Sequence, residues 1–213
     1  MRIGILGTGN VGRAVGEGWR DAGHEVVWGS RTPGAERTVP VADAAGFGEV
    51  VVNATPGTAS MELLRGVGGA ALAGKVLVDI GIGFTDDMGL SHPGVSLGEE
   101  IQQAFPETAV VKTLCTMTAA VMRDPGLVAE RSTVFLSGDD DAAKRTTRAL
   151  LSDLGWPESS QLDLGGIATA RGQEHFALLF LGVAGALGTH TFNIRVVPPT
   201  AGTATTASTA THE

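Results

Sequence analysis

The stretch GILGTGNVGRAVGEGW, residues 4–19, carries glycines in the spacing G-x-G-x-x-G at Gly7, Gly9 and Gly12. In a chain with 31 glycines this spacing is a weak signal by itself, and it gains weight where a strand precedes it and a helix follows. In that setting Gly7 permits a tight turn, Gly9 lets a pyrophosphate approach the backbone, and Gly12 lets the helix pack on the strand. The peptide N–H groups from Thr8 to Val11 would face the phosphates at the positive helix end. The pattern therefore predicts a dinucleotide site.

The residues that follow the second apolar run indicate which dinucleotide is bound. An NAD site usually places Asp or Glu about 20 residues after the fingerprint, where it binds the ribose 2′-hydroxyl. Here the sequence has Ser30, Arg31 and Thr32 instead. An arginine offers a planar cationic fork for a 2′-phosphate and can lie over the adenine, and the two hydroxyl groups add donors. The pattern favours NADP(H).

Few side chains could take part in the chemistry itself. Hydride transfer depends mainly on position and polarity, because the cofactor carries the reactive C–H bond. A carbonyl or imine acceptor would also need a proton donor, and the candidates are Lys112, Cys115, Thr116, His175 and His190. A small buried hydrophobe is the alternative for Cys115, and structural roles are the alternative for the histidines. We expect no metal site, because no pair of histidines has ligand spacing beside a carboxylate cluster.

The elements that must position these residues alternate between strands and helices. Short apolar runs predict strands at 2–6, 25–29, 49–56, 75–81, 109–114 and 133–138. Helical patterns separate them. One such helix begins at a capping box formed by Ser96 and Glu99, and another begins at the acids 139–141 and ends at Gly155. This alternation predicts an α/β fold, a Rossmann-type doubly wound and mostly parallel sheet.

The alternation of strands and helices ends at about residue 165, and this change divides the chain into two parts. We expect a Rossmann NADP-binding domain over 1–164 and a small C-terminal helical lobe over 165–197, built on one helix at 167–188. This lobe would complete the substrate cleft and contact a second copy. Gly182, Gly185 and Gly188 would each cost roughly 1 kcal/mol inside that helix, a cost best explained by another backbone close by, as in a homodimer. The Thr/Ala/Pro-rich tail 198–213 is predicted to be disordered.

Composition limits the partners. The chain has 15 Lys and Arg against 23 Asp and Glu, a net charge of −8, and no basic run, which argues against nucleic acid and anionic membranes and favours a small-molecule substrate. The single cysteine excludes an intrachain disulfide. The longest strongly apolar run, 176–188, is shorter than the roughly 20 residues needed to span a bilayer. The first residues enter a strand at once, so we expect no signal peptide and a cytoplasmic location.

Five segments in order carry a resemblance to a known family. They are GTGNVGRAVGEGW, GSRTP, SLGEEIQQAFPETAVVKTL, VFLSGDDDAAKRTTRALLSDLGW and DLGGIATARGQEHFALLFLGVAGALGTHTFNIRVV. Through them the chain resembles, to about Val197, the NADP oxidoreductases that depend on the deazaflavin coenzyme F420. The resemblance implies a Rossmann domain followed by a small helical lobe.

The resemblance also implies site residues. The pyrophosphate would be held by Thr8, Gly9, Asn10, Val11 and Gly12, the 2′-phosphate by Ser30 and Arg31, and the nicotinamide ribose would pass beside Ala54, Thr55 and Pro56. Coenzyme F420 would be the second substrate, in the cleft between sheet and lobe. Two positions depart from the family: Cys115 stands where relatives have Asn, and Ile82 with Gly83 where many have Asn-Pro.

These observations lead to one functional hypothesis and one alternative. The first is an enzyme, an NADP(H)-dependent oxidoreductase that transfers a hydride between NADP(H) and either a deazaflavin or a small carbonyl or imine metabolite. The alternative is an NADP(H)-binding protein without redox turnover, a sensor or a scaffold for non-redox catalysis. The departures at Cys115 and Ile82 motivate this alternative.

Overall fold

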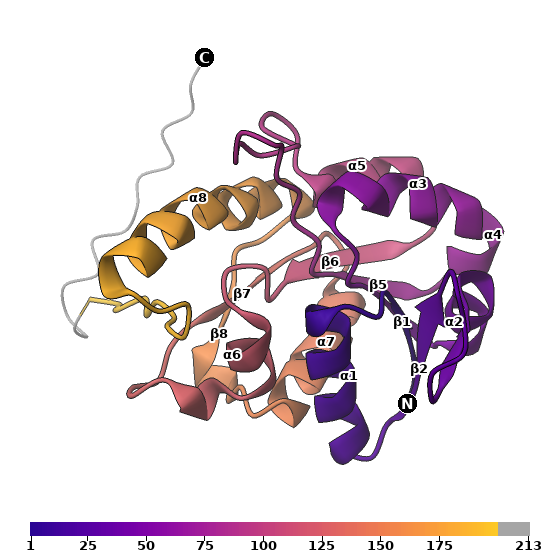
Figure 1. Cartoon of the computed structure of the whole chain (residues 1–213), viewed down its shortest axis with the longest axis horizontal. Coiled ribbons are helices and arrows are strands. Elements are labelled where there is room, and N and C mark those ends of the chain that lie inside the picture. The colour runs from indigo at the N-terminus through magenta and orange to yellow at the C-terminus, as the bar shows by residue number, and fades with distance from the viewer. Residues whose placement is uncertain (200–213) are drawn as a thin grey trace.

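The chain folds around one eight-stranded sheet in the order β3-β2-β1-β4-β5-β6-β7-β8, as a computed structural model of residues 1–199 shows (Figure 1). The expected disordered tail falls almost wholly on residues 200–213, which lie outside the described residues. The strands are β1 (Arg2–Leu6), β2 (Glu25–Ser30), β3 (Thr38–Pro40), β4 (Val50–Asn53), β5 (Val76–Asp79), β6 (Ala109–Thr113), β7 (Val134–Ser137) and β8 (Gln161–Asp163).

The sheet has the doubly wound topology that the sequence predicts. Neighbouring strands are parallel except β6 and β7, which are antiparallel. From β1 the chain winds outward to β2 and β3, and then returns to β4 on the other side of β1. This reversal creates a topological switch point between β1 and β4, the usual place for a ligand in such sheets. The predicted α/β Rossmann-type fold is confirmed.

Helices cover both faces of the sheet. They are α1 (Asn10–Asp21), α2 (Val41–Phe47), α3 (Gly57–Val67), α4 (Gly69–Leu72), α5 (Leu97–Ala104), α6 (Ala119–Arg123), α7 (Asp141–Asp153) and α8 (Ala170–Leu187), with 3-10 turns η1 (Pro125–Leu127), η2 (Glu158–Ser160) and η3 (Ile167–Thr169). One buried cluster joins the sheet to α1, α6 and α7, and a second joins it to α2, α3, α4 and α5 (Figure 1). The result is a three-layer structure with a core on each face of the sheet.

The predicted helix ends are found in the structure. Ser96 and Glu99 form the capping box at the start of α5, and the Asp140 side chain accepts the Ala143 N–H at the start of α7. Gly155, with φ +90°, follows the end of α7. These local signals fix helix ends because they supply partners to backbone groups that the helix leaves unbonded.

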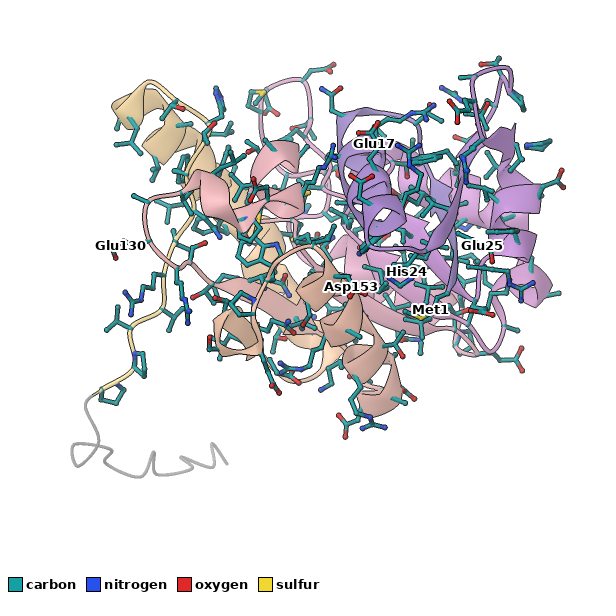
Figure 2. The ribbon with its side chains drawn as sticks, turned by 90° about the horizontal axis from the view of Figure 1, so that it is seen from below. Met1, Glu17, His24, Glu25, Glu130 and Asp153 are labelled. Atoms are coloured by element: carbon teal, nitrogen blue, oxygen red, sulfur yellow. The ribbon has the colours of Figure 1, made fainter. Side chains whose placement is uncertain are left out.

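The start of the chain is tied to the end of α7 on the side shown in Figure 2. The amino group of Met1 lies 3.2 Å from His24 Nδ1, and His24 Nε2 lies 2.9 Å from Asp153 Oδ2. Arg123, the last residue of α6, bonds Glu17 of α1 at 2.8 Å and so joins two helices of the same layer. These contacts fasten α1, α6 and α7 together at the edge opposite the carboxyl ends of the strands.

Helix α8 differs in part from its prediction. The expected helix at 167–188 begins as the 3-10 turn η3, and Gly188 is the left-handed C-cap, with φ +68°, rather than an interior residue. The left-handed conformation explains why a glycine occupies position 188. The earlier explanation, close pairing with another helix, is therefore not needed for Gly188. A Cβ atom at Gly182 or Gly185 would meet nothing within 4 Å. No other segment of the described chain therefore packs closely against those two glycines. That a second copy of the protein packs there stays a prediction.

Candidate functional site

The turn between β1 and α1 has the geometry that a dinucleotide loop requires. Gly7 has φ +122°, and a Cβ atom there would lie 2.6 Å from the Ala54 carbonyl oxygen. A Cβ atom at Gly12 would lie 2.4 Å from the Gly7 oxygen, so helix and turn pack with no room for a side chain. Gly9, the N-cap of α1, has nothing within 4 Å of such an atom. The backbone at Gly9 is thus open beside first-turn N–H groups that have no acceptor within the helix.

An outer pocket of about 580 Å³ lies on one side of this turn. It is lined by Gly7, Thr8, Gly9, Gly29, Ser30, Arg31, Thr32, Val41, Ala42, Ala54, Thr55, Pro56, Ala59, Glu62, Leu63, Gly66 and Val67. The Ser30 Oγ accepts the Thr32 N–H at 3.1 Å and so shapes the turn after β2. Arg31 is exposed and makes no ion pair within residues 1–199. The acidic Glu62 of α3 also faces this pocket, which no motif in the sequence indicates.

An inner cleft of about 460 Å³ lies on the other side, and it shares Gly9, Ala54, Thr55 and Pro56 with the outer pocket. The remaining lining residues are Asn10, Val11, Ile80, Gly81, Ile82, Phe84, Cys115, Met117, Met122, Ala177, Phe180 and Leu181. Every side chain in this lining is uncharged. The only polar ones belong to Asn10, Thr55 and Cys115. The two pockets adjoin at the switch point of the sheet.

The predicted cofactor residues gather around these two spaces. All of them line one pocket or both except Gly12, which is buried beneath the turn. The structure therefore brings together segments from the ends of β1, β2 and β4, as parallel strands require. Their binding roles stay predictions.

Three of the predicted catalytic candidates do not reach the inner cleft. Lys112 is fully buried and paired with carboxylates, so it has no path to a substrate. His175 lies on the exposed face of α8, where its Nδ1 is 2.8 Å from the Arg171 oxygen. Thr116 is 3% exposed, and its hydroxyl has no hydrogen-bond partner within residues 1–199. These positions argue against direct contact with a reacting atom, because none of the three residues lines the inner cleft.

Cys115 does line the inner cleft, but its environment disfavours reactivity. Its Sγ donates a weak hydrogen bond to Gln173 Oε1 at 3.8 Å. Burial raises the pKa of the Cys115 thiol to about 12, although the nearby Lys112 partly offsets the effect. The thiolate is the nucleophilic form, so this cysteine is a neutral thiol at physiological pH.

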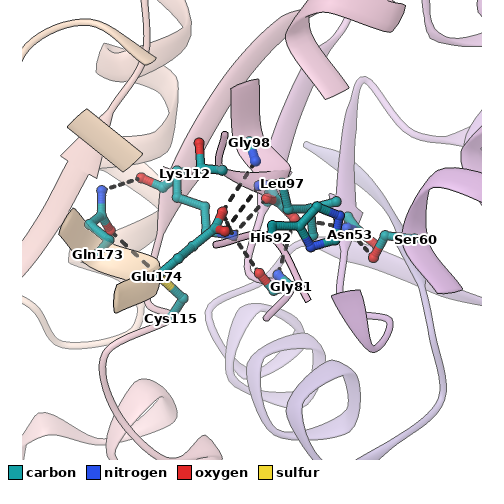
Figure 3. A network of polar contacts seen from close by, with 12 residues as sticks. Asn53, Ser60, Gly81, His92, Leu97, Gly98, Lys112, Cys115, Gln173 and Glu174 are labelled. Carbon is teal, nitrogen blue, oxygen red and sulfur yellow. Dashed lines mark hydrogen bonds and ion pairs between the residues drawn. The ribbon is translucent and has the colours of Figure 1, made fainter. Parts of the chain in front are cut away.

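A row of buried polar residues runs beneath the cleft, across four neighbouring strands. Asn53, Asp79, Lys112 and Ser137 occupy paired positions on β4, β5, β6 and β7. Asn53 Nδ2 donates to Asp79 Oδ1 at 2.8 Å, and Lys112 Nζ lies 2.8 Å from Asp79 Oδ2 (Figure 3). Residues paired in register point to the same face of a sheet. The row therefore forms one continuous polar strip at the carboxyl ends of the strands.

The polar strip meets the first turns of α8. Glu174 Oε1 lies 2.8 Å from Lys112 Nζ, and the same carboxylate accepts the N–H groups of Leu97 and Gly98 at the start of α5 (Figure 3). Gln173 Nε2 donates to Ser137 Oγ at 2.8 Å. Burial alone would lower the pKa of Lys112, but Asp79 and Glu174 raise it above its usual value, so the ammonium stays charged.

Sequence reasoning missed this strip, although a signal was present. The runs VLVD and AVVKT each place a charged residue, Asp79 and Lys112, in a strand that is otherwise apolar. A charged residue in a buried parallel strand must have a partner, because an unpaired charge there is costly. That rule predicts a pair without saying which residues form it.

The open glycine turn, the hydroxyl and arginine residues after β2, and two adjoining pockets at the switch point define a dinucleotide-binding Rossmann protein. The sequence profile of the family described as "NADP oxidoreductase coenzyme F420-dependent" matches residues 2–83. A crystal structure of a candidate F420-dependent NADP reductase from Arthrobacter sp. FB24 is 42% identical, with a TM-score of 0.86, and the match covers 93% of this chain and 100% of that one. The chain belongs to this family of NADP-dependent oxidoreductases.

More distant relatives share part of this architecture. The metalloreductase STEAP3 of Rattus norvegicus is 30% identical over 189 residues, which is 84% of this chain and 37% of that protein, so the chain spans little more than a third of its length. An imine reductase from Myxococcus stipitatus in complex with NADP⁺ is 19% identical, with a TM-score of 0.66, over 88% of this chain and 63% of that one. The latter likeness concerns the fold alone. Within residues 1–199, no helix has the length and apolar character to cross a membrane.

Proposed function

We propose that this protein transfers a hydride between NADP(H) and the planar deazaflavin ring of coenzyme F420, bound in the inner cleft. The observation that carries the proposal is the uncharged lining of that cleft, directly beside the glycine turn. Such a lining holds water weakly and suits two stacked planar rings. It offers no ionic partner to a charged group placed beside the reacting carbon.

The residues around the turn fit NADP(H). The open backbone at Gly9 and the first-turn N–H groups of α1 would hold the pyrophosphate, and the 2′-phosphate would lie against Ser30, Arg31 and Thr32. Ala54, Thr55 and Pro56, common to both pockets, would pass beside the nicotinamide ribose. When bound, the cofactor supplies the transferable hydride, and the chain supplies position and exclusion of water.

The same lining favours a deazaflavin over a small carbonyl or imine. Reduction of a carbonyl develops charge on one oxygen and is helped by a proton donor within hydrogen-bond reach. The cleft offers only the Asn10 amide, the Thr55 hydroxyl and the neutral thiol of Cys115. A conjugated ring that spreads the incoming charge needs no donor at the reacting atom.

The test is to mix the protein with NADPH and oxidised F420 and follow NADPH absorbance over many turnovers. A panel of small carbonyl and imine compounds forms the comparison, and NADH replaces NADPH in a matched series. We expect turnover with F420 and preference for NADPH. Turnover with the panel and none with F420 would refute the deazaflavin assignment.

One observation favours the alternative of NADP(H) binding without redox turnover. Both departures from the family pattern, Cys115 and Ile82, lie in the wall of the inner cleft. Under this alternative, calorimetry would give tight NADPH binding while no acceptor is turned over. The same absorbance experiment therefore decides between the two.

We also propose that the protein is a cytoplasmic homodimer joined through α8, in which residues 165–197 act as a lobe that completes the cleft. Leu179 and Leu187 of α8 are each 59% exposed, and Gly182 and Gly185 leave the surface between them open to a close backbone. Sedimentation velocity of Leu179→Glu beside the natural protein tests it. A natural protein that sediments as a monomer would refute this interface.

A further inference from the structure

Lys112 contacts both walls of the inner cleft from beneath, although it lines neither. Its Nζ donates to the Gly81 carbonyl oxygen and lies 2.8 Å from both Asp79 Oδ2 and Glu174 Oε1. An ammonium group has three donors, and these three acceptors use all of them. Gly81 belongs to one wall of the cleft, and Glu174 belongs to the helix that forms the other (Figure 3).

The first wall is the segment from Ile80 to Ile82. Its backbone is held at three points: Asp79 Oδ1 accepts the Gly81 N–H at 3.0 Å, Lys112 binds the Gly81 carbonyl, and the Ile82 carbonyl accepts the Gly57 N–H at 2.9 Å. The side chains of Ile80 and Ile82 face the cleft. The two contacts at Gly81 both depend on the Asp79 and Lys112 pair.

The second wall is the inner face of α8. Glu174 precedes Ala177 by three residues and Leu181 by seven, a spacing that places all three on one face of the helix. The Glu174 carboxylate binds Lys112 together with the Leu97 and Gly98 N–H groups of α5. The position of this carboxylate therefore sets where Ala177 and Leu181 stand in the cleft.

We propose that Lys112 is a positioning residue that fixes the separation of the two cleft walls, by binding the Gly81 carbonyl and the Glu174 carboxylate at once. The inference rests on the proposed function, since it assigns how the hydride-transfer cleft keeps its width. Without the ammonium, two buried carboxylates, Asp79 and Glu174, face each other and repel. Helix α8 then moves outward, because Asp79 is held by the sheet.

The cleft contains its own reporter, the single cysteine of the chain. Cys115 lines the inner cleft and is 7% exposed. Its rate of alkylation by the uncharged reagent N-ethylmaleimide measures access to the cleft. Lys112→Met has two effects on this rate, and they have opposite signs. Loss of the nearby positive charge raises the pKa of the thiol and slows alkylation, whereas an opened cleft speeds alkylation.

The variants are Lys112→Met and Glu174→Gln, with Arg171→Met as the matched control. Arg171 also joins α8 to α5, through bonds to Glu99 at 2.6 and 2.7 Å, but its side chain is exposed and bonds neither Gly81 nor Glu174. Glu174→Gln keeps the shape of the side chain and carries the test if Lys112→Met fails to fold. Because loss of the Glu174 charge by itself lowers the pKa of the Cys115 thiol, alkylation of this variant is measured over a range of pH and compared at equal thiolate fraction. Alkylation is followed at several low urea concentrations, because local opening depends on urea weakly and global unfolding steeply.

We expect alkylation about tenfold faster in Lys112→Met and in Glu174→Gln, with weak urea dependence, and unchanged in Arg171→Met. With NADPH and F420, we expect a KM for F420 about tenfold higher and a kcat lower by up to about 100-fold, because a misplacement near 1 Å has such an effect. The NADPH dissociation constant should change far less than the KM for F420, since none of the three residues that Lys112 bonds lines the outer pocket.

Folded variants that alkylate at the natural rate or more slowly would overturn the proposal. A faster rate with the urea dependence of global unfolding would do the same, because it would show only lost stability. If the natural protein does not turn over F420, the proposed function fails, while the alkylation rates still decide whether Lys112 holds the cleft walls.

Discussion

Two glycines of the same turn have opposite surroundings, and this difference separates a binding role from a folding role. A Cβ atom at Gly9 meets nothing within 4 Å, whereas one at Gly12 lies 2.4 Å from the Gly7 carbonyl oxygen. We therefore compare Gly9→Ala with Gly12→Ala. The first should leave the fold intact and impair NADPH binding, and the second should impair both.

The effect of Gly9→Ala on stability follows from two terms of opposite sign. The Gly9 backbone, with φ −75° and ψ −176°, is accessible to alanine, so reduced freedom of the unfolded chain stabilises by about 0.4–1 kcal/mol. Alanine is a poorer N-cap than glycine, which costs about 0.5–1 kcal/mol. The free energy of unfolding should thus change by less than about 1 kcal/mol. At Gly12 the overlap with a backbone oxygen forces α1 to shift, at a cost of about 1–3 kcal/mol.

The effect of Gly9→Ala on binding should be far larger. A methyl group at this position stands where the pyrophosphate must approach the first-turn N–H groups. Loss of one charge-assisted hydrogen bond costs about 1.5–3 kcal/mol, which is roughly 10- to 100-fold in the dissociation constant. Urea unfolding without ligand measures the first effect, and calorimetric titration with NADPH measures the second. NADPH binding by Gly9→Ala with the natural affinity would refute the assignment of the pyrophosphate to this turn.

Three further predictions concern other parts of the site. Arg31→Glu should weaken NADPH binding by at least about tenfold and NADH binding far less, and equal losses in calorimetry would refute the 2′-phosphate assignment. The Arg171 guanidinium, with help from Ser96, lowers the pKa of Glu99 from its usual 4.5 to about 2, so Glu99 stabilises the fold above about pH 5 and loses this contribution as pH falls towards 2. The full pKa shift would correspond to about 3 kcal/mol of stability, and solvent around the half-exposed Arg171 reduces this to about 1 kcal/mol. The free energy of unfolding of Glu99→Gln and of the natural protein is measured at pH 6 and at pH 2.5. The difference between the two proteins should be smaller at pH 2.5 than at pH 6. Cys115→Ala should keep kcat with F420 within about threefold, since the thiol is neutral, and a 100-fold loss would restore it as a catalytic residue.

Much of the fold could be predicted because its signals are local. The central strands are continuous apolar runs, and the starts of α5 and α7 are marked by capping residues at fixed spacing. The edge strands β3 and β8 were missed, since each has only three residues and much of each is exposed. A short edge strand is set by its neighbour, and apolar periodicity does not reveal it.

The two halves of the candidate site differ in the same way. The glycine turn and the residues after β2 lie within about 30 residues of chain, where spacing alone carries their geometry. Lys112 shows the opposite case. Its type suggested a proton donor, but the pairing of β5 with β6 places it opposite Asp79, 33 residues earlier in the chain, and buries it. The register between β5 and β6 decides that Lys112 is a buried ion-pair partner. That register cannot be read from a single sequence.

The buried charges beneath the cleft require an explanation beyond stability. A well-packed apolar replacement of a buried ion pair is often neutral or stabilising, so such pairs are weak grounds for extra stability. The inner face of α8 is largely apolar, with Ala177, Phe180 and Leu181 in the cleft, and apolar contacts alone tolerate many positions of one helix against its neighbours. Glu174 removes that freedom: a shift of α8 by one turn, about 5.4 Å, would take its carboxylate away from Lys112 and from the N–H groups of α5 and leave charges unpaired. The polar strip thus selects one position of α8, and an apolar cleft without any charge of its own acquires a defined width from charges placed just outside it.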